Sequence, residues 1–201
     1  CEPFSGKSAL VLGLARHLLS EGRTVRFGKP LATSLEWTAK GSPLPDPLID
    51  DDVRFVGTTL GFDETRLIPS LHLLSPETAD TRLRQGNLDA GTGLEMLLKD
   101  LQNDPNSFTM LEAAGSLHEG LMYGLSLVQL AQGLDAPVIL VHLWQDSRSV
   151  DALLAAQQQL GDRLAGVVLN AVTPDEVEEL NQHVVPALQA LGLKVFGVMP
   201  R

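Results

Sequence analysis

The second half of the sequence alternates short apolar runs with longer stretches of helical periodicity, and this alternation restricts the fold more than any other feature. Residues 150–160 and 175–191 predict helices. The apolar runs predict strands at residues 108–111, 138–143, 167–169 and 195–198. Nearly continuous apolar strands separated by helices are typical of a parallel sheet with helices on both faces. The sequence therefore predicts an α/β fold, in which ligands bind beyond the carboxyl ends of the strands.

The first half predicts three further elements. Leucines at four-residue spacing indicate a helix over residues 9–19. Alternation over 24–27 indicates a strand that ends at a lysine-proline pair, because proline lacks the donor that strand pairing needs. Three consecutive aspartates, 50–52, precede a helical pattern over 53–60, and early acidic residues favour the positive end of a helix.

The composition and net charge indicate which classes of protein and of binding partner are compatible with the sequence. The 201 residues are 44% hydrophobic and 20% charged, which is ordinary for one globular domain over residues 1–201. The formal net charge of −10 repels polyphosphate backbones and argues against a nucleic-acid partner. No apolar stretch approaches the about 20 residues of a membrane span. The single cysteine, Cys1, cannot form an internal disulfide, which suits a reducing interior, so we expect a cytoplasmic protein.

The sequence Ser5-Gly6-Lys7-Ser8 directly precedes the predicted helix 9–19. Backbone N–H groups of such a loop and the helix N-terminus point at one anion, so Lys7 would meet phosphate charge and the Ser8 hydroxyl would hold magnesium. Together with the α/β pattern, this predicts a P-loop NTPase-like fold. A turn followed by a serine cap fits the same residues. Cys1 stands where the usual motif begins with glycine.

Polar residues follow several of the predicted strands. A second cation near the phosphates would stabilise charge that develops during phosphoryl transfer, and Lys29 is the candidate, although a surface lysine at a strand end fits equally. Magnesium takes one or two carboxylates, which makes Asp52 and Glu112 the candidate metal ligands. For Asp52 a helix-start role is nearly as good an interpretation. Asn170, after the strand 167–169, offers an amide that could read a purine edge or only support a turn.

One glycine-containing segment is left out of these candidates. Gly91-Thr92-Gly93 resembles a phosphate loop superficially, but no strand leads into it, so we interpret it as a turn.

Taken in order, these motifs resemble those of dethiobiotin synthetase over nearly the whole chain. The matching segments are residues 5–8, 29–30, 52, 75–76, 112–115, 170–174 and 197–200. The resemblance implies ATP and Mg²⁺ as cofactors and a homodimer. It implies that Lys7 and Ser8 bind phosphate and magnesium and that Lys29 assists phosphoryl transfer. Asp52 and Glu112 would complete the metal site, while Asn170 would contact the base and Pro200 would flank it.

One segment departs from that family. Glu112 is followed by Ala113, Ala114, Gly115 and Ser116, where the family has a Gly-Ala-Gly-Gly type stretch that approaches substrate. The added side-chain atoms narrow this approach, so we expect no dethiobiotin synthetase activity.

In residues 2–8 and 111–115 the chain resembles the dethiobiotin-synthetase-like N-terminal domain of long phosphotransacetylases. That resemblance implies a nucleotide-sensing regulatory module. It also leads us to expect the first strand upstream of Cys1 and a partner domain after Arg201. The alternative is an ATP-dependent ligase of the dethiobiotin synthetase or cobyrinate amide synthase type.

Overall fold

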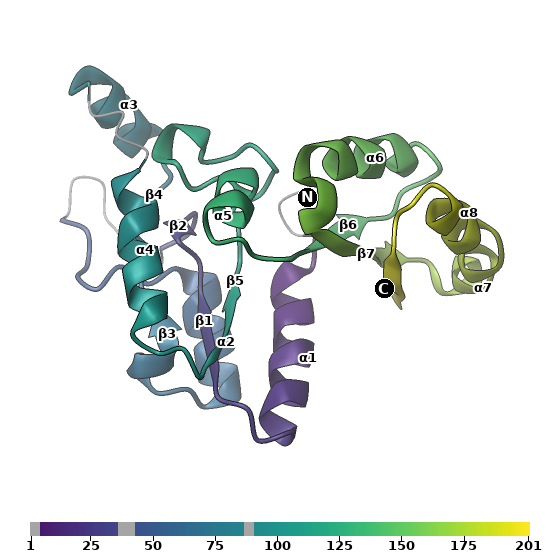
Figure 1. The fold of residues 1–201 in the computed structure, drawn as a ribbon, viewed down its shortest axis with the longest axis horizontal. Coiled ribbons are helices and arrows are strands. Elements are labelled where there is room, and N and C mark those ends of the chain that lie inside the picture. The colour runs from purple at the N-terminus through teal and green to yellow at the C-terminus, as the bar shows by residue number, and fades with distance from the viewer. Residues whose placement is uncertain (1–4, 36–42, 87–90) are drawn as a thin grey trace. The chain divides into compact units, whose positions relative to one another are not determined.

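The computed structural model describes residues 5–35, 43–86 and 91–201, so Cys1 lies outside the described part. It confirms the α/β class, with parallel strands and flanking helices (Figure 1). The chain forms two compact units. The first contains residues 1–7, 115–117 and 128–201, and the second contains residues 8–114 and 118–127.

The second unit has two parallel sheets. One has the order β3-β1-β5, with β1 (Val25–Gly28) between β3 (Leu67–Ile68) and β5 (Phe108–Leu111). The other pairs β2 (Leu31–Ala32) with β4 (His72–Leu73). The predicted strand at 108–111 is confirmed, and the strand expected at 24–27 is found one residue later in the sequence. The carboxyl ends of β1 and β5 are therefore neighbours, because Gly28 is in register with Leu111.

The predicted helices of this unit are confirmed within two residues at their starts and one at their ends. They are α1 (Lys7–Ser20) and α2 (Asp51–Leu60). The structure adds α3 (Pro76–Arg84), α4 (Thr92–Gln102) and the short 3₁₀ segments Glu64–Arg66 and Leu121–Tyr123. The interpretation of residues 91–93 as a turn was wrong, because α4 begins at Thr92. Gly93 is buried in α4, where an added Cβ would lie 3.6 Å from Leu71.

The core of the second unit forms around β1. Phe27 of β1 and Val53 and Val56 of α2 are fully buried, and Ile49 joins them. Partly buried side chains from α1, β3 and β5, among them Val11, pack against this cluster. Each fully buried apolar side chain of this size stabilises the fold by about 1.5–3 kcal/mol. This packing fixes the start of α2 near the end of β1.

The first unit has a parallel sheet in the order β6-β7-β8. These strands are β6 (Val138–Leu143), β7 (Leu164–Val172) and β8 (Val195–Pro200). Its helical segments are α5 (Leu127–Gly133, which begins in the second unit), α6 (Ser149–Leu160), α7 (Val177–Glu179) and α8 (Val185–Ala190), with 3₁₀ turns at Gly161–Arg163 and Pro174–Glu176. Because β7 continues to Val172, Asn170 lies within the strand rather than after it, which corrects the prediction.

The helix expected over 175–191 is broken into segments of different type. A π-helical stretch, Leu180–Val184, separates α7 from α8. Pro186 lies in the first turn of α8 and lacks the N–H that a regular helix would use there. The loss of that bond explains the local widening.

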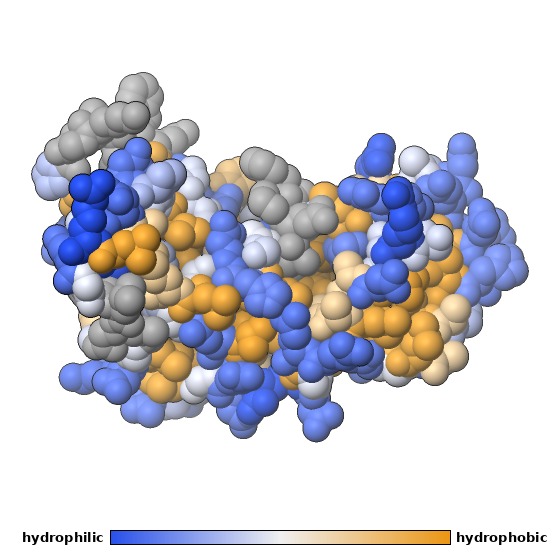
Figure 2. Space-filling view, turned by 90° about the horizontal axis from the view of Figure 1, so that it is seen from above, coloured by the Kyte–Doolittle hydropathy of each residue, from blue (hydrophilic) through white to orange (hydrophobic). Residues whose placement is uncertain are grey.

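Within the described residues, no helix is both long and apolar enough to cross a membrane. Apolar atoms do reach the surface in patches among hydrophilic ones (Figure 2). Phe55, Leu83 and Met96 are each more than half exposed and belong to different helices. Single exposed apolar side chains are normal on globular surfaces.

Candidate functional site

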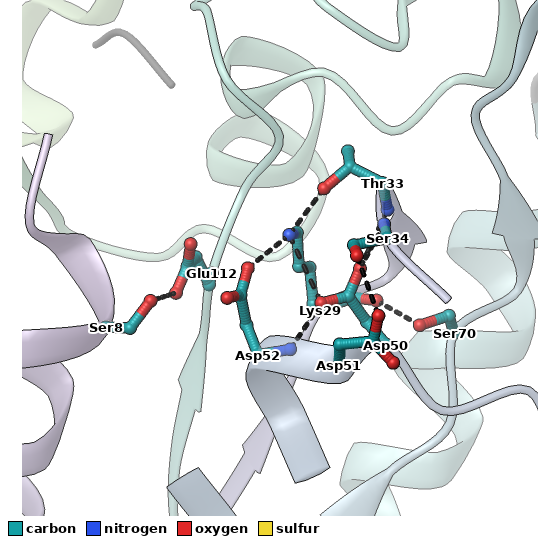
Figure 3. A network of polar contacts seen from close by, with 9 residues as sticks. All are labelled: Ser8, Lys29, Thr33, Ser34, Asp50, Asp51, Asp52, Ser70 and Glu112. Atoms are coloured by element: carbon teal, nitrogen blue, oxygen red, sulfur yellow. Dashed lines mark hydrogen bonds and ion pairs between the residues drawn. The ribbon is translucent and has the colours of Figure 1, made fainter. Parts of the chain in front are cut away.

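Lys29 follows β1 directly and is buried, with 3% of the residue exposed. Its Nζ donates to Thr33 Oγ1 at 2.6 Å, to Asp52 Oδ2 at 2.7 Å and to Asp50 Oδ1 at 3.2 Å. Figure 3 shows these side chains converging on the ammonium group. The alternative interpretation of Lys29 as a surface lysine is therefore wrong, because its side chain is buried.

The surroundings of Lys29 keep it charged. Burial has the largest single effect on its pKa and lowers it, since burial disfavours the charged form. The hydrogen bond to Asp52 and the negative charges of Asp50, Asp52 and Glu112 together outweigh burial, so the pKa of Lys29 is raised above 10.5. At neutral pH the site therefore contains a fixed cation surrounded by several carboxylates.

Asp50 is the N-cap residue of α2 and is fully buried. Its carboxylate accepts from the backbone N–H of Thr33 at 2.7 Å, of Ser34 at 3.1 Å and of Asp52 at 2.9 Å. Neither Asp50 nor Thr33 was among the candidate site residues predicted from the sequence. The preference for aspartate at N-caps was the available signal for Asp50.

Asp52 lies in the first turn of α2, and its side chain is 42% exposed. The position of Asp52 is compatible with both interpretations from the sequence, a metal ligand and an acidic residue at a helix start. It complements the positive helix end, and it presents a carboxylate beside Lys29 that solvent can reach.

Glu112 follows β5 and extends the pairing with β1, because its N–H donates to Gly28 O at 2.9 Å. The residue is 5% exposed. Ser8, in the first turn of α1, donates its hydroxyl to Glu112 Oε2 at 3.2 Å (Figure 3). The second unit thus brings Ser8, Lys29, Asp52 and Glu112 into one region.

The side-chain oxygens of Ser8 and Glu112 are of the kind that binds magnesium. No group of three or more His, Cys, Asp or Glu side chains suited to a metal ion occurs in residues 5–35, 43–86 and 91–201. Magnesium does not need such a cage, since it is usually bound by one or two carboxylates with phosphate and water. A buried carboxylate beside a hydroxyl, Glu112 and Ser8, provides hard oxygen donors. The surplus of negative charge around Lys29 also fits a further cation.

The first unit contains the remaining loop residues. Asn170 Nδ2 donates to the carbonyl oxygen of Ser5 at 2.7 Å. Gly6 has φ +85°, and a Cβ placed on it would lie 2.1 Å from that Nδ2. The buried Ser5 hydroxyl has no hydrogen-bond partner among the described residues. A glycine is therefore required at position 6, and the loop retains an unused polar atom.

Two other predicted residues are located as follows. Lys7 is the first residue of α1. Pro200 ends β8 and is in register with Val172 of β7, two residues beyond Asn170. Next to Asn170, Ala171 has φ +59°, an uncommon value for a residue other than glycine, and the register with β8 is irregular there. Asn170 and Pro200 therefore lie near the same ends of two neighbouring strands.

The parallel α/β fold and the Ser-Gly-Lys-Ser loop that opens α1 define a P-loop nucleotide-binding protein. The family described as AAA domain matches residues 1–201, and the chain belongs to that family. It is similar to the ATP-dependent dethiobiotin synthetase BioD of Pseudomonas aeruginosa, with 27% identity across 98% of this chain and 85% of the relative. The ATP-dependent dethiobiotin synthetase BioD of Pseudomonas paraeruginosa shows 27% identity across the same shares. The resemblance to dethiobiotin synthetase is thereby confirmed.

Proposed function

We propose that this chain binds ATP with Mg²⁺ and positions the terminal phosphoryl group for transfer, as a ligase-like domain. The observation that supports it most is the buried, charged Lys29, which lies with Asp52 at the carboxyl end of β1. A preorganised cation at such a place stabilises negative charge without reorganising during the reaction.

In this proposal, different residues bind the phosphates and the metal ion. The backbone of Ser5 and Gly6 and the Lys7 ammonium bind the phosphates. Ser8 and Glu112 would hold the metal ion. Bound Mg²⁺ would neutralise phosphate charge there.

The exposed carboxylate of Asp52 would supply a further oxygen ligand for this ion. Lys29 would act on the charge that develops on the transferred group. Asn170 and Pro200 contact the base. Because the amide of Asn170 is used by Ser5 in this structure, base contact needs its carbonyl oxygen or a rotation of the amide.

A second candidate is a nucleotide-sensing regulatory module of the phosphotransacetylase type. Ala113, which follows Glu112 and stands where the resembled family has glycine, is buried, so its methyl group fills space that glycine would leave open. A domain of this kind would bind the nucleotide without an acceptor substrate. For either function we propose a cytoplasmic homodimer.

Calorimetry with ATP, in the presence and absence of Mg²⁺, tests the binding step. Lys29→Met should leave ATP affinity within about tenfold of the unsubstituted chain while it removes any phosphoryl transfer, since the interaction forms mainly in the transition state. Absence of ATP binding by the unsubstituted chain would refute the proposal. Binding of ATP without hydrolysis or transfer to any carboxylate acceptor would favour the sensing module.

A further inference from the structure

Asp50 makes more contacts than a helix cap requires. An N-cap residue needs one bond, and Asp50 makes it by accepting from the Asp52 N–H at 2.9 Å. The same Oδ1 also accepts from Lys29 Nζ at 3.2 Å. Its Oδ2 accepts from the N–H groups of Thr33 at 2.7 Å and Ser34 at 3.1 Å. Asp50 therefore joins α2, the segment after β2 and the lysine.

The carboxylates of Asp50 and Asp52 both contact Lys29, and they differ in whether water or a cation can take over that contact. The Asp52 side chain is 42% exposed, so water or a cation can take over its contact with Lys29. The Asp50 side chain is 0% exposed, and the protein donors just described use both of its oxygens. Asp52 is thus an exchangeable partner although its contact with Lys29 is the shorter one, and Asp50 is a permanent partner.

We propose that Asp50 is the positioning residue of the site. It fixes the Lys29 ammonium and the Thr33–Ser34 backbone in place, whether or not Asp52 keeps its contact with Lys29. The inference rests on the proposed function, in which Lys29 acts on the phosphoryl group. Asp50 is not a catalytic residue, because it would act on the phosphoryl group through Lys29 and not by touching it.

Substitutions can separate positioning from capping. Asp50→Ser keeps a side-chain cap for α2 but is too short to reach Lys29 and the Thr33–Ser34 segment together. Asp50→Asn keeps the shape and removes the charge, and it is the second variant if the serine chain does not fold. Asp51→Asn is the matched control, because Asp51 is the neighbouring carboxylate and accepts from the Ser34 hydroxyl. Thermal unfolding checks that each variant is folded.

The first measurement needs no nucleotide. In ¹⁵N-lysine-labelled protein, NMR should detect the Lys29 ammonium as a slowly exchanging signal in the unsubstituted chain. We expect this signal to persist in Asp51→Asn and Asp52→Asn and to be lost in Asp50→Ser and Asp50→Asn. Its persistence without Asp50, or its loss without Asp52, would overturn the proposal. This result is independent of whether the chain binds ATP.

The second measurement is the affinity for Mg²⁺–ATP in a double-mutant cycle. With Lys29 present, Asp50→Ser should weaken binding by about threefold to tenfold, no more than Lys29→Met does. In a Lys29→Met background the same substitution should change affinity by less than about twofold, because Asp50 acts through Lys29. Equal losses in both backgrounds would assign Asp50 to general structure and overturn the proposal. If the unsubstituted chain binds no Mg²⁺–ATP, the proposed function fails, and the exchange of the Lys29 signal still decides the role of Asp50.

Discussion

The side-chain amide of Asn170 donates a hydrogen bond to the backbone carbonyl of Ser5 over 2.7 Å, and the two residues are 165 positions apart in the sequence. The contact ties the loop before α1 to β7 within the first unit. It also leaves no space for a side chain at Gly6.

Gly6→Ala should therefore destabilise the chain. An added Cβ would lie 2.1 Å from Asn170 Nδ2, and φ +85° is strained for alanine. We expect a loss of about 1–3 kcal/mol in the free energy of unfolding, measured by denaturant titration. Gly13→Ala in α1 is the control, because nothing lies within 4 Å of its Cβ position, and it should be neutral or stabilising. An equal effect of both substitutions would contradict the steric argument.

Lys7→Ala should abolish detectable ATP binding, because the Ser5–Ser8 loop loses its only cationic side chain. Calorimetry checks this, with Lys99→Ala on α4 as a surface control. Unchanged ATP affinity in Lys7→Ala would exclude this loop as the phosphate site.

Glu112→Gln should weaken nucleotide binding more in the presence of Mg²⁺ than in its absence, because the ion interacts directly with the lost charge. Titrations of ATP with and without Mg²⁺ measure the difference, and Asp52→Asn should show a smaller effect of the same kind. Equal weakening under both conditions would assign Glu112 to structure alone.

Lys29 and Glu112 could be predicted as candidate site residues, because polar residues that end apolar strands stand out from the pattern. Asp50 could not be singled out, since three adjacent aspartates look alike in a sequence. Which of the three is buried depends on the residue at which α2 starts, and that is Asp51. If α2 started one residue earlier or later, a different aspartate would be the buried N-cap residue.

The missed elements have different causes. Helix α4 has leucines at positions 94, 97, 98 and 101, a helical period that was available in the sequence. The π-helical stretch Leu180–Val184 was not predictable from periodicity, because it arises from the local adjustment around Pro186.

His72 should give the stability of the chain a dependence on pH. Burial lowers the pKa of His72 from 6.5, and the positive charge of Arg82 lowers it further. The folded state thus favours neutral His72, so its contribution is present above about pH 6.5 and is lost as the pH falls below it. Melting temperatures at pH 5 and 7.5 should differ less in His72→Gln than in the unsubstituted chain. An unchanged difference would show that other groups cause the dependence.

The last prediction concerns the acceptor substrate. Ala113 and Ser116 stand where dethiobiotin synthetases have glycine, and Ala113 is buried. A side chain that moves a substrate by about 1 Å can slow a reaction by on the order of a hundredfold. We therefore expect no product above background from ATP, Mg²⁺, bicarbonate and diaminopelargonate, while calorimetry still detects ATP binding. The double variant Ala113→Gly/Ser116→Gly is the matched test, and a gain of activity there would identify these two side chains as the obstruction. Turnover by the unsubstituted chain at about 1 per second or more would instead make it a dethiobiotin synthetase.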